Sequence, residues 1–234
     1  MLCLCRRHLM LGATGTLVAG TSTSRAAGEL PRYCSMNGGA LTSTQLLSSS
    51  GDRRLDNALI AELRNVMNVM PVNPGFKFIR DPEPNAFAMP DTIVNGTRGT
   101  VLLGLNLIRQ EMAEAEYGGV SVAGISAHEC GHIFQYFSDY GKELAGSNSM
   151  HIELHADYLA GFYMGRRRSF SADRVAVFAR SIHSKGDYSY NDKDHHGTPD
   201  QREDAMMAGY AAAAQGLGFE PAAKRGASFV RRIQ

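Results

Sequence analysis

Apolar residues recur every three or four positions along most of the chain, which is the spacing of a helix that buries one face. The longest regular stretch is 52–70, and Pro71 marks its end. The same pattern predicts five further helices, at 105–116, 122–137, 150–166, 172–184 and 199–215. Gly118-Gly119 is expected to end the second helix, and Thr198-Pro199 to begin the last one, with threonine as the N-cap.

Three shorter apolar stretches lack this spacing and predict strands at 76–79, 85–89 and 99–103. A turn that contains Asn95-Gly96 separates the last two, which indicates an antiparallel hairpin. We therefore expect an α+β protein, mainly helical, with a small antiparallel sheet beside helix 122–137.

Helix 122–137 carries the sequence His128-Glu129-Cys130-Gly131-His132, an H-E-x-x-H pattern. Residues four apart share a helix face, so the two imidazoles can bind one metal ion. Glu129 follows the first histidine and can act as general base on a water molecule bound to that ion. The apolar neighbours of both histidines predict a largely buried helix, in which imidazoles need partners.

Helix 150–166 brings a second group of polar side chains into an apolar surround. Glu153 and Asp157 are four residues apart, and two buried carboxylates are costly unless something pairs with them. His151 and His155 form a competing pair that lies roughly 200° around the helix from Glu153. One helix cannot direct both pairs at a single ion. We favour the carboxylates as the functional pair and expect His151 and His155 to be partly exposed or hydrogen-bonded.

These residues predict one zinc ion bound by His128, His132 and Glu153. Two imidazoles and one carboxylate leave a position open for water, as in catalytic zinc sites. Asp157 is expected to hydrogen-bond a ligand histidine and fix its tautomer. The metzincin pattern, which needs a glycine and a third histidine further along, is excluded because the chain has Gln135 and Ser138 there.

The composition of the chain does not indicate a function other than metal binding. A formal net charge of +1 over 234 residues gives no sign of a nucleic-acid partner, and the basic stretch 224–232 is expected to be solvated. Cys34 and Cys130 could form a disulfide in an oxidising compartment. Because Cys130 lies within helix 122–137, between the two histidines, we expect it to pack as a small apolar residue instead.

The first 27 residues have the order of a secretory signal, in which Arg6-Arg7 precedes a short apolar run and then small residues. The arginine pair and the weak hydrophobicity resemble the twin-arginine export signal of bacteria. We predict a leader at 1–27, one domain at 28–234, and export to the periplasm or out of the cell. Removing the leader takes away three arginines and no acid, which changes the formal charge from +1 to −2. An uncleaved anchor is the alternative, but the run is well short of the ~20 residues that a span needs.

The paired motifs at 128–132 and 153–157 resemble the H-E-x-G-H and E-x-x-A-D signature of gluzincin peptidases. The related groups are the HtpX and CAAX-prenyl-protease family and the bacterial neutral zinc metallopeptidases, and the resemblance covers 85–157. It implies a zincin-like fold, Glu153 as the third zinc ligand and Asp157 beside a ligand histidine. The membrane helices of the HtpX and CAAX group are absent, which indicates a soluble, exported relative.

A weaker resemblance to a further family element covers 196–199 and Arg202. It favours His196 as the donor to the oxyanion that forms during hydrolysis. His195, Tyr190 and Arg202 remain alternative donors, and bracing of the loop remains the alternative role for all four.

The function that this site predicts is a zinc-dependent metalloendopeptidase acting on a peptide or protein substrate, with no membrane span in the mature chain. Two alternatives stay open: a zinc amide hydrolase of cell-wall peptides, and a non-catalytic zinc-containing binding module. Retention of Glu129 argues against the module, because a structural site needs no base there. The sequence sets neither the oligomeric state nor the cleavage specificity.

Overall fold

A computed structural model describes most of the chain after its first 28 residues. The described residues are 29–30, 34–35, 41–42, 46–115, 118–146, 148–183 and 196–233. The predicted leader at 1–27 lies outside them, as do Tyr190 and His195.

The largest sheet is mixed, with the strand order β2-β6-β7-β5-β4. Its strands are β2 (Cys34–Ser35), β4 (Leu46–Leu47), β5 (Gly75–Ile79), β6 (Ala86–Met89) and β7 (Thr100–Gly104). The predicted hairpin is confirmed, since β6 and β7 pair antiparallel. The prediction of a purely antiparallel sheet is wrong, because β7 lies between β6 and β5 and pairs with β5 in parallel. Two short strands, β1 (Glu29–Leu30) and β3 (Leu41–Thr42), form a separate pair.

Helices make up most of the described chain. They are α1 (Arg53–Val69), α2 (Leu105–Ala113), α3 (Gly118–Tyr136), α4 (Tyr140–Glu143), α5 (Met150–Arg166), α6 (Ala172–His183), α7 (Pro199–Ala214) and α8 (Phe219–Val230). Thr198 caps α7 through a capping box with Gln201, as its position before Pro199 predicted.

One local prediction is wrong and another is incomplete. Gly118 and Gly119 do not follow the end of a long second helix; they are the first residues of α3. The basic residues of 224–232 are exposed, as predicted, but most of this stretch belongs to α8, a helix that the sequence did not predict and whose small residues form a buried face. The lysine and arginine side chains on the other face concealed that apolar stripe in the sequence.

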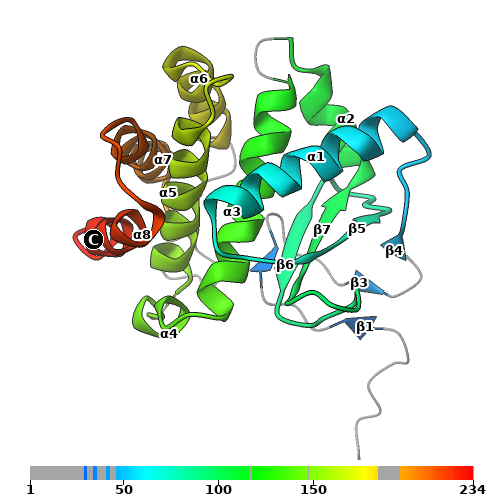
Figure 1. The fold of residues 1–234 in the computed structure, drawn as a ribbon, viewed down its shortest axis with the longest axis horizontal. Helices are drawn as coiled ribbons and strands as arrows, with labels where there is room; N and C mark the ends of the chain where they lie inside the picture. Colours follow the sequence, from blue (N-terminus) through cyan, green and yellow to red (C-terminus); the bar gives the residue numbers. More distant parts are fainter. Residues whose placement is uncertain are drawn as a thin grey trace, which may run out of the picture.

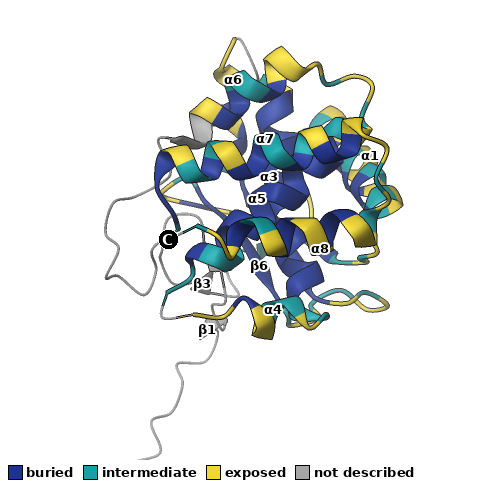
Figure 2. Ribbon diagram, turned by 90° about the vertical axis from the view of Figure 1, so that its left-hand side faces the viewer, coloured by how far each residue is buried: buried dark blue, intermediate teal, exposed yellow. Residues whose placement is uncertain are grey.

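The long helix α3 lies at the centre of the fold, between the sheet and α5 (Figure 1). On the far side of α5 lie α7 and α8, while α1 crosses near the sheet. Both α3 and α5 are buried along nearly their whole length, whereas α8 alternates buried and exposed residues (Figure 2). Within the described ranges, no helix combines the length and apolar character needed to cross a bilayer.

Close contact between α5 and α7 depends on two glycines. A Cβ atom added to Gly161 would lie 1.9 Å from the carbonyl oxygen of Met206, and one added to Gly209 would lie 1.9 Å from that of Tyr158. Both obstacles are backbone atoms, which cannot move aside without separating the helices. These glycines therefore set the distance between the helix that carries Glu153 and the helix that carries Arg202.

We expect Gly161→Ala to lower the free energy of unfolding by about 3 kcal/mol, because the added methyl group overpacks a backbone contact. Urea denaturation checks this. Gly119→Ala is the matched control, since its Cβ would find its nearest neighbour 4.0 Å away, and it should change stability by less than about 0.5 kcal/mol. Equal unfolding midpoints for the two variants would contradict the packing argument.

Candidate metal centre

Three buried side chains from two helices converge on one point. His128 and His132 project from one face of α3, and their Nε2 atoms are 3.0 Å apart. Glu153 reaches this point from α5, with Oε2 3.4 Å from Nε2 of His128 and Oε1 3.5 Å from Nε2 of His132. The three residues are only 0–4% exposed. The structure therefore brings together the three side chains that the sequence predicted as metal ligands.

The spacing of the three donor atoms fits a single metal ion. Bonds of 2.0–2.1 Å at tetrahedral angles would place ligand atoms roughly 3.3 Å apart, and the three observed separations span 3.0–3.5 Å. Two ring nitrogens this close, both directed at a carboxylate, form a compact set of electron-pair donors. The cluster of His128, His132 and Glu153 can therefore hold a metal ion.

Asp157 and Arg202 hold His128 in position. Nδ1 of His128 donates to Oδ1 of Asp157 at 2.8 Å, which leaves Nε2 as the electron-pair donor. Arg202, from α7, donates to both carboxylate oxygens of Asp157 at 2.8 and 3.0 Å. The hydrogen bond predicted between Asp157 and a ligand histidine is therefore present. The predicted alternative role of Arg202 as an oxyanion donor has no support, because its guanidinium is directed at Asp157.

The charges in this group shift its pKa values strongly. Burial alone lowers the pKa of His128, but Asp157 and Glu153 outweigh burial and raise it to about 10. Burial alone raises the pKa of Asp157, but Arg202 and His128 outweigh it and hold that pKa below its ordinary value. A metal ion that binds to Nε2 therefore displaces a proton from His128.

His196 lies at the same site, beside Glu153. Its Nδ1 is 3.3 Å from Oε2 of Glu153. Burial alone raises the pKa of Glu153, but His132, His128 and His196 together hold it well below its usual range. Glu153 is thus an anionic carboxylate surrounded by imidazoles. The oxyanion role of His196 stays a prediction, while its contact with Glu153 is a feature of the structure.

Glu129 is fully buried next to the metal ligands. Among the described residues, neither of its carboxylate oxygens has a hydrogen-bond partner. Burial raises the pKa of Glu129, and the nearby charges of His128 and His132 oppose this effect only in part. A buried carboxylate without a partner is costly in a structural role. It is the expected state of a base that acts on a water molecule or substrate.

Gln135 is a residue at the site that the sequence pattern did not identify. Its Oε1 accepts a hydrogen bond from Nδ1 of His132 at 2.8 Å. In the sequence, Gln135 stood out only because it occupies the position of the metzincin glycine. Its position one helical turn after His132 could have indicated the contact.

The two histidines that the sequence set aside are not part of the metal cluster. His155 is buried and hydrogen-bonded, with Nε2 donating to the carbonyl oxygen of Ala223 at 3.0 Å. His151 lies 3.1 Å from the carbonyl oxygen of Ile233. Cys130 is a free, buried thiol in the main core, where burial raises its pKa, so it packs as the small apolar residue that was predicted.

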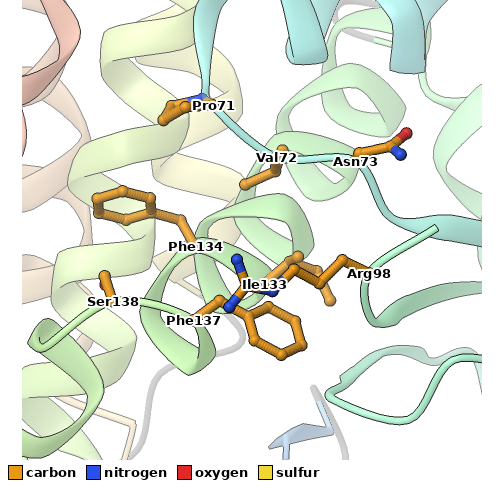
Figure 3. A pocket seen from close by; sticks show the side chains of 8 residues that line it. All are labelled: Pro71, Val72, Asn73, Arg98, Ile133, Phe134, Phe137 and Ser138. Carbon is orange, nitrogen blue, oxygen red and sulfur yellow. The ribbon is translucent and has the colours of Figure 1, made fainter.

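A cavity of about 360 Å³ lies against the end of α3 (Figure 3). Ile133 and Phe134 of α3 and Phe137, just after the helix, line it. Ile133 and Phe134 lie roughly 120–140° around the helix axis from the two clustered histidines. The guanidinium of Arg98 covers the ring of Phe137 at 4.3 Å. The cavity therefore lies on a different side of α3 from the cluster of His128, His132 and Glu153.

Comparisons with known proteins bring no further assignment. No protein-family model matches the chain, and neither a curated protein nor a solved structure is significantly similar to it. The interpretation of the site therefore depends on its own geometry and chemistry.

Proposed function

We propose that this protein is an exported, zinc-dependent metalloendopeptidase of the gluzincin type with a zincin-like fold. The observation that carries the proposal is the buried set of His128, His132 and Glu153, with the unpartnered carboxylate of Glu129 one residue from the first histidine. A structural metal site has no use for such a carboxylate, whereas a hydrolytic site needs a base there.

The donor set supports zinc as the metal. Two neutral imidazoles and one carboxylate suit this ion and leave one position for a substrate or water. Zinc held by these three side chains would acidify a water molecule and polarise the scissile carbonyl. Asp157 keeps Nε2 of His128 available, and His196 lies where it can orient Glu153.

In the proposed reaction, Glu129 removes a proton from the attacking water, whose oxygen adds to the carbonyl carbon. The carbon–nitrogen bond then breaks, and Glu129 returns the proton to the departing amine. A donor to the oxyanion would complete the site, and we assign this role to His196, which lies beside Glu153. The products are a new carboxyl terminus and a new amino terminus.

The test is cleavage of a diverse peptide pool by the purified, zinc-loaded protein, followed by mass spectrometry of the products. Cleavage should disappear when a chelator removes the metal and return when zinc is restored. A protein that binds one zinc ion per chain and cleaves no peptide would overturn the endopeptidase proposal. The same preparation would then be assayed on cell-wall peptides, where cleavage would identify an amide hydrolase of that class.

A further inference from the structure

The hydrogen bonds around Gln135 determine which way its amide group faces. Its Nε2 is 2.8 Å from the carbonyl oxygen of Ile152, on α5. A carbonyl oxygen can only accept, so the group that faces it must be the amide NH₂. Oε1 therefore faces Nδ1 of His132, and that nitrogen must carry the proton.

The second amide hydrogen of Gln135 begins a chain of hydrogen bonds that runs through His155 to α8. Nε2 of Gln135 is 3.1 Å from Nδ1 of His155, which must accept because the amide only donates. Nε2 of His155 then carries the ring proton and donates to the carbonyl oxygen of Ala223 at 3.0 Å. Every donor along this path meets an acceptor, and both side chains are at most 1% exposed.

The two candidate ligand histidines are thus held in different ways. His128 is held by a charged pair, Asp157 with Arg202. His132 is held by a chain of neutral groups that ends on the backbone of α8. In both cases Nδ1 donates to its partner, so Nε2 is the nitrogen left to bind a metal ion. The neutral chain achieves this without adding a further buried charge to a site that already contains three carboxylates.

We propose that Gln135 and His155 are positioning residues for His132, which couple the carbonyl of Ala223 on α8 to the orientation and tautomer of this metal ligand. The proposal rests on metal binding by the cluster, as in the proposed function, and does not depend on peptide cleavage. Removal of either residue should weaken metal binding, although neither contacts the ion.

The first experiment measures zinc affinity by competition with a chromophoric chelator. Gln135→Leu should bind zinc about 10- to 100-fold more weakly than the unaltered protein. Gln135→Glu should recover part of this loss, because its carboxylate still accepts from Nδ1 of His132 but no longer donates to Ile152 and His155. A higher zinc affinity in Gln135→Glu than in Gln135→Leu, whose side chain has a similar size, would show that the acceptor matters and not only the space that the side chain fills.

His155→Phe and His151→Phe form a matched pair one helical turn apart on α5. Both lose a hydrogen bond to a backbone carbonyl, but only His155 contacts Gln135. His155→Phe should weaken zinc binding by roughly tenfold, towards the lower end of the range for indirect contacts. His151→Phe should stay within twofold of the unaltered protein. Melting temperatures measured without metal show whether each variant folds. If Gln135→Leu does not fold, the comparison of His155→Phe with His151→Phe tests the proposal on its own.

A spectroscopic signature completes the test. In protein labelled with ¹⁵N at histidine and loaded with zinc, Nδ1 of His132 should carry a proton that exchanges slowly with water. The same proton should exchange faster in Gln135→Leu, while that of His128 is unchanged.

Zinc affinities of Gln135→Leu and His155→Phe within twofold of the unaltered protein would overturn the proposal, as would equal losses in His155→Phe and His151→Phe. Absence of zinc binding in the unaltered protein would overturn the metal site and this proposal together. Zinc binding without peptide cleavage would overturn only the proposed activity.

Discussion

Glu129→Gln should reduce kcat/KM for peptide cleavage by about 1,000-fold, within the range that general acid–base catalysis contributes. Glutamine has nearly the same shape but cannot take a proton from water. Zinc content should stay at that of the unaltered protein, because Glu129 is not in the cluster of His128, His132 and Glu153. Loss of cleavage with retention of metal is the pattern expected of a base, as opposed to a ligand.

The control is Glu114→Gln, which changes an exposed glutamate just after α2 and should leave cleavage unaltered. Initial rates across a series of substrate concentrations, with zinc measured by elemental analysis on the same samples, provide the comparison. A Glu129→Gln protein that binds zinc and keeps more than about a tenth of the activity would contradict the role of this carboxylate, since the loss would lie below the ~100-fold minimum for such a base.

Arg202→Met should lower the free energy of unfolding of the metal-free protein by about 3–5 kcal/mol. This is the cost of removing one partner of a buried ion pair and leaving the charge of the other without compensation. Asp157 is fully buried and accepts two hydrogen bonds from Arg202. Methionine fills part of the space but leaves the carboxylate with His128 alone. Zinc affinity should fall as well, because Asp157 would then hold the imidazole less firmly.

An exposed ion pair between an arginine and a carboxylate provides the control. Arg231 and Glu143 form an ion pair at 2.7 Å, with side chains 45% and 50% exposed. Arg231→Met should therefore change stability by at most about 1 kcal/mol. Urea denaturation of both variants measures the difference. If Arg202→Met were no more destabilising than Arg231→Met, the buried pair would not hold α5 and α7 together as the structure indicates.

The sequence predicted six of the eight described helices and the side chains of the cluster, because these follow from periodicity, whereas α4 and α8 had no predicted counterpart. Residues three or four apart share a helix face, so His128 with His132, and Glu153 with Asp157, could be placed without knowledge of how the helices pack. Thr198 and Pro199 similarly marked the start of α7 through local backbone chemistry.

The features that the sequence did not predict depend on contacts between distant segments. The parallel pairing of β5 with β7 arises because β7 enters the sheet between β5 and β6, which no local pattern encodes. The glycines that begin α3 have the same local signature as a helix end. The spacing of Gln135 and His132 could have indicated their contact, but the orientation of the amide depends on the carbonyl groups and the imidazole that α5 and α8 supply.

The most direct test of the metal site is X-ray absorption at the zinc edge, on protein loaded with one equivalent of zinc. The geometry predicts nitrogen and oxygen ligands at about 2.0–2.1 Å, with scattering from two imidazoles and no sulfur. The imidazole signal should fall by half in His132→Ala. A sulfur ligand at about 2.3 Å, which would implicate a cysteine, or a spectrum unchanged in His132→Ala, would contradict the central claim that His128, His132 and Glu153 bind the metal.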